Sequence, residues 1–337
     1  MPKPSKLVSA PNPEHFREAE ELAERAPKPA VWQNVRFATA GWADRSLVHD
    51  SPFYPKTAKT PEARLRHYAS EFSLVEVDAT YYALLGADLV ARWLEWTEPR
   101  FRFDVKAHPI VTGHPIDVAR LPRDLKVVCE DAGIGPRVYP EKLPDEIRRE
   151  IEARFAASLE PLRVAERLDA VLAQFPPWFA ATRGNVRRLE DVADRWGTLP
   201  LAVEFRHKSW LEPSRQERVF GLLRELGMSY VCVDEPPSRS GGLPNVVSVT
   251  NPRLAVVRFH GQNREGWEKK GASVAERFNY LYRPAELSAW VAPLRRLSAE
   301  AESVHAVFNN CVRNYAVLNA KDLAFLLGEA GATNEAS

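Results

Sequence analysis

The chain is poor in cysteine and has almost no excess of charge of either sign. Its three cysteines, Cys129, Cys232 and Cys311, lie far apart and form no C-x-x-C pair, so the sequence indicates neither a disulfide framework nor a zinc knuckle. A reducing compartment, the cytoplasm, is the expected location. The 46 lysines and arginines balance 45 aspartates and glutamates. This balance argues against a polybasic nucleic-acid binder but leaves room for a local basic groove.

The sequence also lacks the apolar runs that export or anchor a chain. Residues 1–7 contain two prolines and two lysines and none of the apolar core of a signal peptide. No segment approaches the roughly 18 consecutive apolar residues of a membrane-spanning helix. We therefore expect no association with membranes.

Strand-like and helix-like segments alternate along most of the 337 residues. Runs rich in Val, Leu, Phe and Ala predict eight strands, at residues 35–40, 74–79, 101–107, 168–175, 199–205, 229–234, 254–260 and 304–308. Helical patterns predict helices at residues 62–72, 87–97, 145–165, 187–196, 217–226, 284–299 and 316–327. Eight nearly continuous apolar strands are typical of a closed parallel barrel, in which both faces of each strand are buried. We predict an α/β fold of the TIM-type (β/α)8 barrel class.

An open doubly wound sheet is the competing architecture. Such a sheet usually carries a glycine-rich phosphate-binding turn after its first strand, and residues 41–44 contain a single glycine. The lack of this turn favours the barrel.

A single barrel domain is expected over residues 35–330. An N-terminal extension, residues 1–34, precedes it, and a tail, residues 331–337, follows it. The longest interruption is an insertion at about residues 108–167, after the third strand, which begins with a polar, proline-bearing stretch. A lid, a dimer contact and a partner surface are all compatible with this insertion, and the sequence does not fix the oligomeric state.

Nearly every predicted strand ends in a polar or ionisable residue, and the active sites of TIM barrels lie at the carboxyl ends of the strands. The catalytic candidates are Glu76, Lys106, Glu204 and Asp234. The ligand-binding candidates are Trp42, Tyr81, Arg206, Arg258, His260, Asn309 and Asn310. Side chains two positions apart on a strand share a face, so pairs such as Glu204 and Arg206 are expected to converge on the barrel axis. Structural ion pairs inside the barrel, such as Glu204 with Arg258, are the alternative.

Several motifs of the chain, taken in order, resemble the YecE-like family, also called domain of unknown function 72. The motifs are Gly41-Trp42, Phe53-Tyr54-Pro55, the segments 75–82 and 101–107, Gln174-Phe175-Pro176-Pro177, the segments 203–207 and 257–261, and Phe308-Asn309-Asn310. The resemblance runs from about residue 37 to residue 327. It implies a TIM barrel distantly similar to endonuclease IV and xylose-isomerase-like barrels, with a proposed link to nucleic acid and no established reaction.

One motif departs from the family pattern. The family commonly shows Asn-Ser-Thr-Phe-Tyr after the second strand, whereas this chain has Asp78-Ala79-Thr80-Tyr81-Tyr82. The departure keeps the hydrogen-bonding and aromatic character of the segment. It also adds a carboxylate at position 78.

Two chemistries suit the strand-end residues. One divalent metal ion held by Glu204, Asp234 and His260 would support hydrolysis or isomerisation. Without a metal, Glu204 or Glu76 would act as a general base while Lys106 and the other cations hold an anion. We favour a hydrolase-like enzyme, phosphodiesterase-like or else an isomerase, that binds a phosphorylated or nucleotide-type ligand at the C-terminal mouth of the barrel.

Nucleic-acid binding is the alternative function. Aromatic and cationic residues are interleaved around the predicted mouth, among them Trp42, Tyr81, Trp178, Trp267, Arg206 and Lys208. Such a pattern suits stacking on bases together with contacts to phosphates. The alternative is therefore a non-catalytic or weakly catalytic protein, distantly similar to endonuclease IV, that binds single-stranded nucleic acid.

Overall fold

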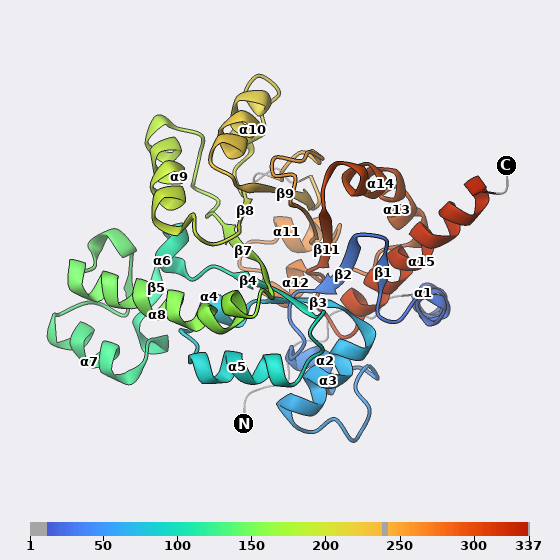
Figure 1. The fold of residues 1–337 in the computed structure, drawn as a ribbon, viewed down its shortest axis with the longest axis horizontal. Helices are drawn as coiled ribbons and strands as arrows, with labels where there is room; N and C mark the ends of the chain where they lie inside the picture. Colours follow the sequence, from blue (N-terminus) through green and yellow to red (C-terminus); the bar gives the residue numbers. More distant parts are fainter. Residues whose placement is uncertain (1–11, 238–241, 336–337) are drawn as a thin grey trace.

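Parallel strands surround the centre of the molecule in the computed structural model, which describes residues 12–237 and 242–335 (Figure 1). Over these residues the strands are β2 (Val35–Thr39), β3 (Leu74–Val77), β4 (Arg102–Lys106), β7 (Leu168–Gln174), β8 (Leu201–Glu204), β9 (Ser229–Asp234), β10 (Leu254–Phe259) and β11 (Ser303–Phe308). Their order is β2-β11-β10-β9-β8-β7-β4-β3, and β1 (Val31–Trp32) adds an antiparallel edge to β2. The predicted TIM-type barrel and its eight strands are confirmed.

The barrel closes between β2 and β3 through few backbone contacts. A parallel bridge joins Ala40 to Glu76, and the amide of Gly41 donates to the Glu76 carbonyl at 2.8 Å. Gly41 has a φ of 95°, a conformation that glycine adopts without strain. Lower in this seam, the Tyr68 hydroxyl accepts from the Thr39 amide at 3.0 Å and donates to the Leu74 carbonyl at 3.2 Å. A side-chain hydroxyl thus replaces part of the backbone ladder.

Helices cover the outside of the barrel (Figure 1). The longer ones are α3 (Pro61–Glu71), α5 (Ala87–Glu95), α8 (Asp145–Val164), α9 (Arg183–Trp196), α10 (Gln216–Glu225), α14 (Val291–Glu300) and α15 (Tyr315–Glu335). The short ones are α2 (Arg45–His49), α4 (Ala79–Tyr82), α6 (Pro109–Thr112), α11 (Arg264–Glu268), α12 (Val274–Arg277) and α13 (Pro284–Ser288). Helices α3 and α9 each have a threonine N-cap. The hydroxyls of Thr60 and Thr182 accept a hydrogen bond from the backbone amide three residues further on. None of the helices described is long and apolar enough to cross a bilayer.

One connection between barrel strands contains no helix in its described part, in agreement with the helices predicted above. Between β9 and β10 the described residues, 235–237 and 242–253, form no helix. Instead the chain is held to the sheet by Thr250, whose hydroxyl accepts from the Tyr230 amide and donates to the Met228 carbonyl, both at 2.7 Å. The helix predicted at residues 284–299 is divided, into α13 and α14.

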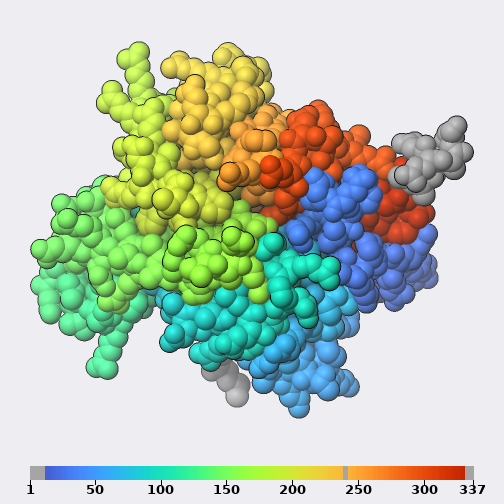
Figure 2. Space-filling view, in the orientation of Figure 1, coloured from blue at the N-terminus to red at the C-terminus, as the bar shows by residue number. Residues whose placement is uncertain are grey.

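The segment after β4 forms a lobe at one end of the molecule, drawn in green in Figures 1 and 2. It contains α6, the antiparallel pair β5 (Ile116–Asp117) and β6 (Arg137–Val138), and α7 (Arg123–Asp131). Single 3-10 turns occur at Val118–Arg120 and Pro140–Lys142, and another, outside the lobe, at Lys208–Trp210. Leu125 and Cys129 of α7 are buried in the main hydrophobic core, so the lobe is packed onto the barrel.

The N-terminal extension packs against the last helix at the opposite end of the molecule (Figure 1). Helix α1 (Pro13–Arg25) buries Ala19 and Ala23 in a small cluster with Tyr315 and Leu318 of α15. Helix α15 continues to Glu335, so the predicted tail is helical up to that residue. Residues 1–11 and 336–337 lie outside the described part of the chain.

Charged side chains are also buried inside the barrel, away from its C-terminal end. His305 of β11 meets Asp104 of β4 across the axis, with 2.8 Å between Nδ1 and Oδ2, and both side chains are buried. A register shift between β4 and β7 leaves Asp169 without a partner in β4, and its carboxylate lies 3.5 Å from Nε2 of His305. Burial lowers the pKa of His305, but Asp104 and Asp169 raise it more, to about 9. His305 is therefore protonated at neutral pH.

This pair predicts a loss of stability at alkaline pH. The imidazole holds its proton more tightly in the folded chain than in the unfolded chain, where its pKa is about 6.5. Its contribution, about 3 kcal/mol, is complete below about pH 6.5 and is lost as the pH rises through about 9. Urea unfolding at these two pH values would measure the loss, which we expect to shrink in the double variant His305→Gln/Asp104→Asn. An equal loss in both proteins would contradict the assignment.

Candidate functional site

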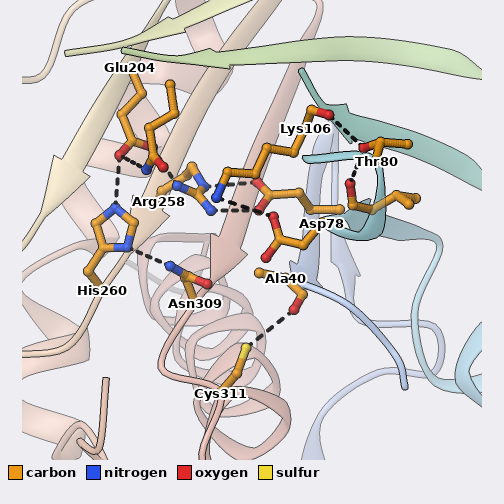
Figure 3. Close-up of polar contacts among 12 residues, drawn as sticks. Ala40, Asp78, Thr80, Lys106, Glu204, Arg258, His260, Asn309 and Cys311 are labelled. Carbon is orange, nitrogen blue, oxygen red and sulfur yellow. Dashed lines mark hydrogen bonds and ion pairs between the residues drawn. The ribbon is translucent and has the colours of Figure 1, made fainter. Parts of the chain in front are cut away.

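Carboxylates from two strands contact one arginine near the C-terminal end of the barrel (Figure 3). Arg258 of β10 donates to both oxygens of Glu76 on β3, at 2.8 and 2.6 Å. Its Nη1 lies 2.5 Å from Oε2 of Glu204 on β8. All three side chains are at most 1% exposed. The interior Glu204–Arg258 ion pair, weighed above as a structural alternative, is present.

Glu204 is the most heavily contacted member of this cluster. It accepts from Gln174 Nε2 at 2.6 Å and from Arg206 Nη1 at 3.0 Å, besides Arg258. Arg206 also lies 2.9 Å from a carboxylate oxygen of Glu235. Side chains from β7, from β10 and from the loop after β8 therefore fix the orientation of a single carboxylate.

The two carboxylates that flank Arg258 differ in proton affinity. Burial raises the pKa of Glu204, but Arg258 and His260 lower it more, to well below its ordinary value. Burial, together with the nearby Asp78 carboxylate, raises the pKa of Glu76 to about 7 against the lowering effect of Arg258. Burial thus dominates at Glu76, and the surrounding cations dominate at Glu204.

His260 connects Glu204 to the surface of the mouth. The Asn309 amide donates to Nδ1 of His260 at 2.9 Å, and Nε2 lies 3.3 Å from Oε1 of Glu204. These partners assign the proton of a neutral imidazole to Nε2. Burial lowers the pKa of His260 to about 3, which agrees with a neutral ring.

Lys106 and Asp78 form a second, less buried pair beside the cluster (Figure 3). Lys106 Nζ lies 3.6 Å from Oδ1 of Asp78 and 4.9 Å from the centre of the Tyr81 ring. The Thr80 hydroxyl donates to the Lys106 carbonyl at 2.6 Å, which ties α4 to the end of β4. The Asp78 side chain is 27% exposed, so this pair can meet a ligand that the Arg258 cluster cannot reach.

A cavity of about 1130 Å³ opens at this end of the barrel. Its aromatic lining residues are Trp42, Tyr82, Trp93, Trp96 and Phe278. Its charged lining residues include three carboxylates, Asp44, Asp50 and Asp78, and the exposed Arg45, and Asn309 adds an amide. Trp42 packs edge-on against Trp93, with 5.3 Å between ring centres. The cavity therefore has aromatic walls and is lined by Asp78, the partner of Lys106, and by Asn309, the partner of His260.

The structure brings most of the sequence-predicted residues together. Glu76, Lys106, Glu204, Arg206, Arg258, His260 and Asn309 gather at the C-terminal end of the barrel, with Trp42 in the cavity wall and Tyr81 beside Lys106. The cations there are already paired: Lys106, Arg206 and Arg258 face the carboxylates of Asp78, Glu76, Glu204 and Glu235. Because these carboxylates already neutralise part of the positive charge, the three paired side chains attract an anion less strongly than three unpaired cations would.

Asp234 and Asn310 lie apart from the others. Val233 pairs with the inward-facing Arg258, so the next residue of β9, Asp234, faces outward. The Asp234 carboxylate accepts from the Tyr282 hydroxyl at 2.9 Å and from the Trp290 indole at 2.6 Å. The Asn310 amide donates to the Tyr280 carbonyl and to Oδ1 of Asn319 in α15. Both side chains anchor segments outside the barrel.

The residues do not fit the predicted metal site. Asp234 faces away from the other two proposed ligands, both oxygens of Glu204 face cationic side chains, and Nε2 of His260 carries a proton. Within the described ranges, no group of three or more His, Cys, Asp or Glu side chains is arranged to hold an ion.

Three residues of the site are missing from the sequence-predicted set. Asp78 shares a strand face with Glu76, and this spacing could have identified it. Gln174 and Glu235 also stand at strand ends, but nothing in the sequence shows that they contact Glu204 and Arg206.

Comparisons with known proteins give one family. The family model described as protein of unknown function DUF72 matches residues 36–337. The UPF0759 protein YunF of Bacillus subtilis (strain 168) is 33% identical over 296 residues, which cover 87% of this chain and 94% of the relative.

Solved structures agree with this match. A DUF72 family protein from Thermotoga maritima MSB8 is 30% identical, with a TM-score of 0.66 over 88% of this chain and 99% of that chain. A DUF72 family protein from Enterococcus faecalis V583 is 26% identical, with a TM-score of 0.70 over 87% of this chain and 95% of that chain. The resemblance to the YecE-like family is thereby confirmed, and the chain belongs to the DUF72 family of proteins of unknown function.

Proposed function

We propose that the chain is a hydrolase-like enzyme that binds a nucleotide-type ligand in the cavity at the C-terminal mouth of the barrel. The observation that carries this proposal is the aromatic-walled cavity of about 1130 Å³, whose lining includes Asp78, the ion-pair partner of Lys106. Its size exceeds the roughly 300–1,000 Å³ of typical ligand pockets. A ligand with a flat ring at one end and an ionic group at the other suits such a site.

The aromatic walls suit the base of the ligand. Trp42, Trp96 and Phe278 line the cavity, and stacking of a base on an aromatic side chain contributes about 1–3 kcal/mol. Such stacking tolerates different bases, because every base has a π-face. Discrimination among bases would then depend on polar groups such as the Asn309 amide.

Lys106 suits the phosphate end. An ammonium group has three donors, and its distance of 3.6 Å from Asp78 leaves donors for a phosphate oxygen. Arg258 would not touch the ligand, since it is fully buried between Glu76 and Glu204. We assign Arg258 a positioning role, because it fixes Glu204 and, through His260, the Asn309 amide.

Asp78 suits the role of general base. Its Oδ1 is shielded from solvent and accepts no hydrogen bond within the described residues. The partly exposed Asp78 carboxylate would take a proton from the water that attacks the phosphorus atom, as the bond from phosphorus to the ester oxygen of the leaving group breaks. The leaving oxygen takes up a proton from solvent, and Lys106 stabilises the charge that develops on the phosphoryl oxygens. General-base catalysis of this kind contributes about 10²–10⁴-fold to a rate.

Exposed rings on the rim support the alternative, binding of single-stranded nucleic acid. Tyr81 contacts His114 with 5.4 Å between ring centres, and His114 contacts Trp178 at 5.9 Å. Trp178 is 56% exposed and Tyr82 is 46% exposed. A strand of nucleotides could stack along these rings, of which Tyr82 also lines the cavity.

Lys106→Met tests the proposed phosphate contact. Because a hydrogen bond to a charged group contributes about 1.5–3 kcal/mol, the variant should weaken binding of nucleoside monophosphates about tenfold or more. Binding of the matching nucleosides should change little. Titration followed by tryptophan fluorescence or calorimetry measures both, with the exposed Lys208→Met as the control. Equal losses for nucleosides and nucleotides would refute a phosphate contact at Lys106.

Arg258→Ala tests the positioning role. Removal of the guanidinium leaves two buried carboxylates without their shared partner, so we expect the free energy of unfolding to fall by about 3–5 kcal/mol. The variant Arg258→Met/Glu76→Gln/Glu204→Gln removes all three charges and should regain much of that stability. Urea unfolding measures both proteins. A fully stable Arg258→Ala protein would show that the cluster does not support the fold.

Salt dependence separates the two functions. A nucleic-acid groove that neutralises several phosphates should lose about 10³–10⁵ in affinity for an oligodeoxythymidylate between about 50 and 200 mM salt. Binding of a nucleoside monophosphate in the cavity should change far less. We expect the second behaviour, and a steep salt slope abolished by Trp178→Ala would favour the alternative.

A further inference from the structure

A second cavity, of about 620 Å³, lies at the opposite, N-terminal end of the barrel. The first residues of several strands and the ends of α9 and α10 line it. Its charged lining residues are Arg36, Arg102, Asp169, Arg253 and Glu302. In TIM barrels the residues at this end usually stabilise the fold, and the active site lies at the other end. Charged side chains around a cavity here are therefore unusual.

Arg36 is the central observation. It pairs in register with His305, so its side chain points to the same side of the sheet, toward the barrel interior. Its Nη1 donates to the Ser73 hydroxyl at 3.0 Å. Within the described residues, no carboxylate lies within 4 Å of this guanidinium. A half-buried cation with one neutral partner has donors left for an anion.

The neighbouring charges leave a positive excess. Asp169 is shared between Arg102, at 3.7 Å, and His305, at 3.5 Å. Asp104 is likewise engaged by His305, which stays protonated at neutral pH. The arginines at positions 36, 102 and 253, with His305, make four cations against three carboxylates, those of Asp104, Asp169 and Glu302. The carboxyl ends of α9 and α10 bring partial negative charge, so the guanidinium groups must supply the attraction.

We propose that this N-terminal cavity binds a small, multiply charged anion such as a phosphate group, held by Arg36 and Arg253 with Arg102 beside them. The planar guanidinium donates two parallel hydrogen bonds to phosphate or carboxylate oxygens, which suits this ligand class. The site is separate from the mouth cavity and does not depend on the function proposed for it. Since the anion binds the folded chain and not the unfolded one, it stabilises the barrel by mass action.

Inorganic phosphate is the probe. At constant ionic strength, set with sodium chloride, phosphate should raise the Tm of the full chain in a saturable way. Calorimetry should show that one phosphate binds in the N-terminal cavity of each chain. Arg253→Gln removes an exposed guanidinium from the cavity and should weaken this binding about tenfold or more. Arg36→Gln should have the same effect. Arg187→Gln, which removes an exposed charge on α9 remote from this cavity, is the matched control and should leave phosphate binding unchanged.

Other outcomes would overturn the proposal. A rise in Tm that does not saturate, or an equal loss of binding in Arg187→Gln and Arg253→Gln, would mean that phosphate acts through general charge effects. Binding that is lost in Lys106→Met but kept in Arg253→Gln would place phosphate at the mouth, which would support the proposed function and refute this site. If Arg36→Gln fails to fold, Arg253→Gln decides the question.

Discussion

The buried guanidinium of Arg258 is the group on which the C-terminal half of the barrel depends. A charge in the interior is tolerated only when it is paired and hydrogen-bonded, and Arg258 meets both conditions through Glu76 and Glu204. It thereby ties β10 to two strands that are not its neighbours in the sheet. The orientation of Glu204 then determines that of His260, and His260 in turn orients Asn309 in the cavity wall.

This arrangement divides the charged residues of the barrel into two groups. The inner group, Arg258 with Glu76 and Glu204, is fully enclosed and its members are paired with one another, so its role is to hold strands and orient neighbours. The outer group, Lys106 and Asp78, lies farther apart and is partly exposed. Strand-end residues of similar type therefore differ in their access to a ligand, and this difference is set by depth along the barrel axis and not by residue type.

The sequence predicted the strands well, because runs buried on both faces are distinctive. It also offers an ion pair between Glu204 and Arg258 as one interpretation, since alternation along a strand identifies which residues share a face. Alternation does not show which of the two faces is the inner one, and Asp234 was assigned to the wrong side for that reason. The register shift that frees Asp169 depends on contacts between distant segments. The cavities arise from the whole fold and have no local pattern.

The seam between β2 and β3 has a consequence for how the molecule can move. Every other pair of neighbouring barrel strands shares a backbone ladder, whereas this pair is joined by one bridge and by the hydroxyl of Tyr68. Ala40 and Val77, at the top of the seam, both line the mouth cavity. The β2–β3 seam, which has the fewest hydrogen bonds of the barrel, therefore ends at residues that line the mouth cavity. Strands β2 and β3 can move apart there and widen the cavity entrance without breaking a ladder of backbone hydrogen bonds.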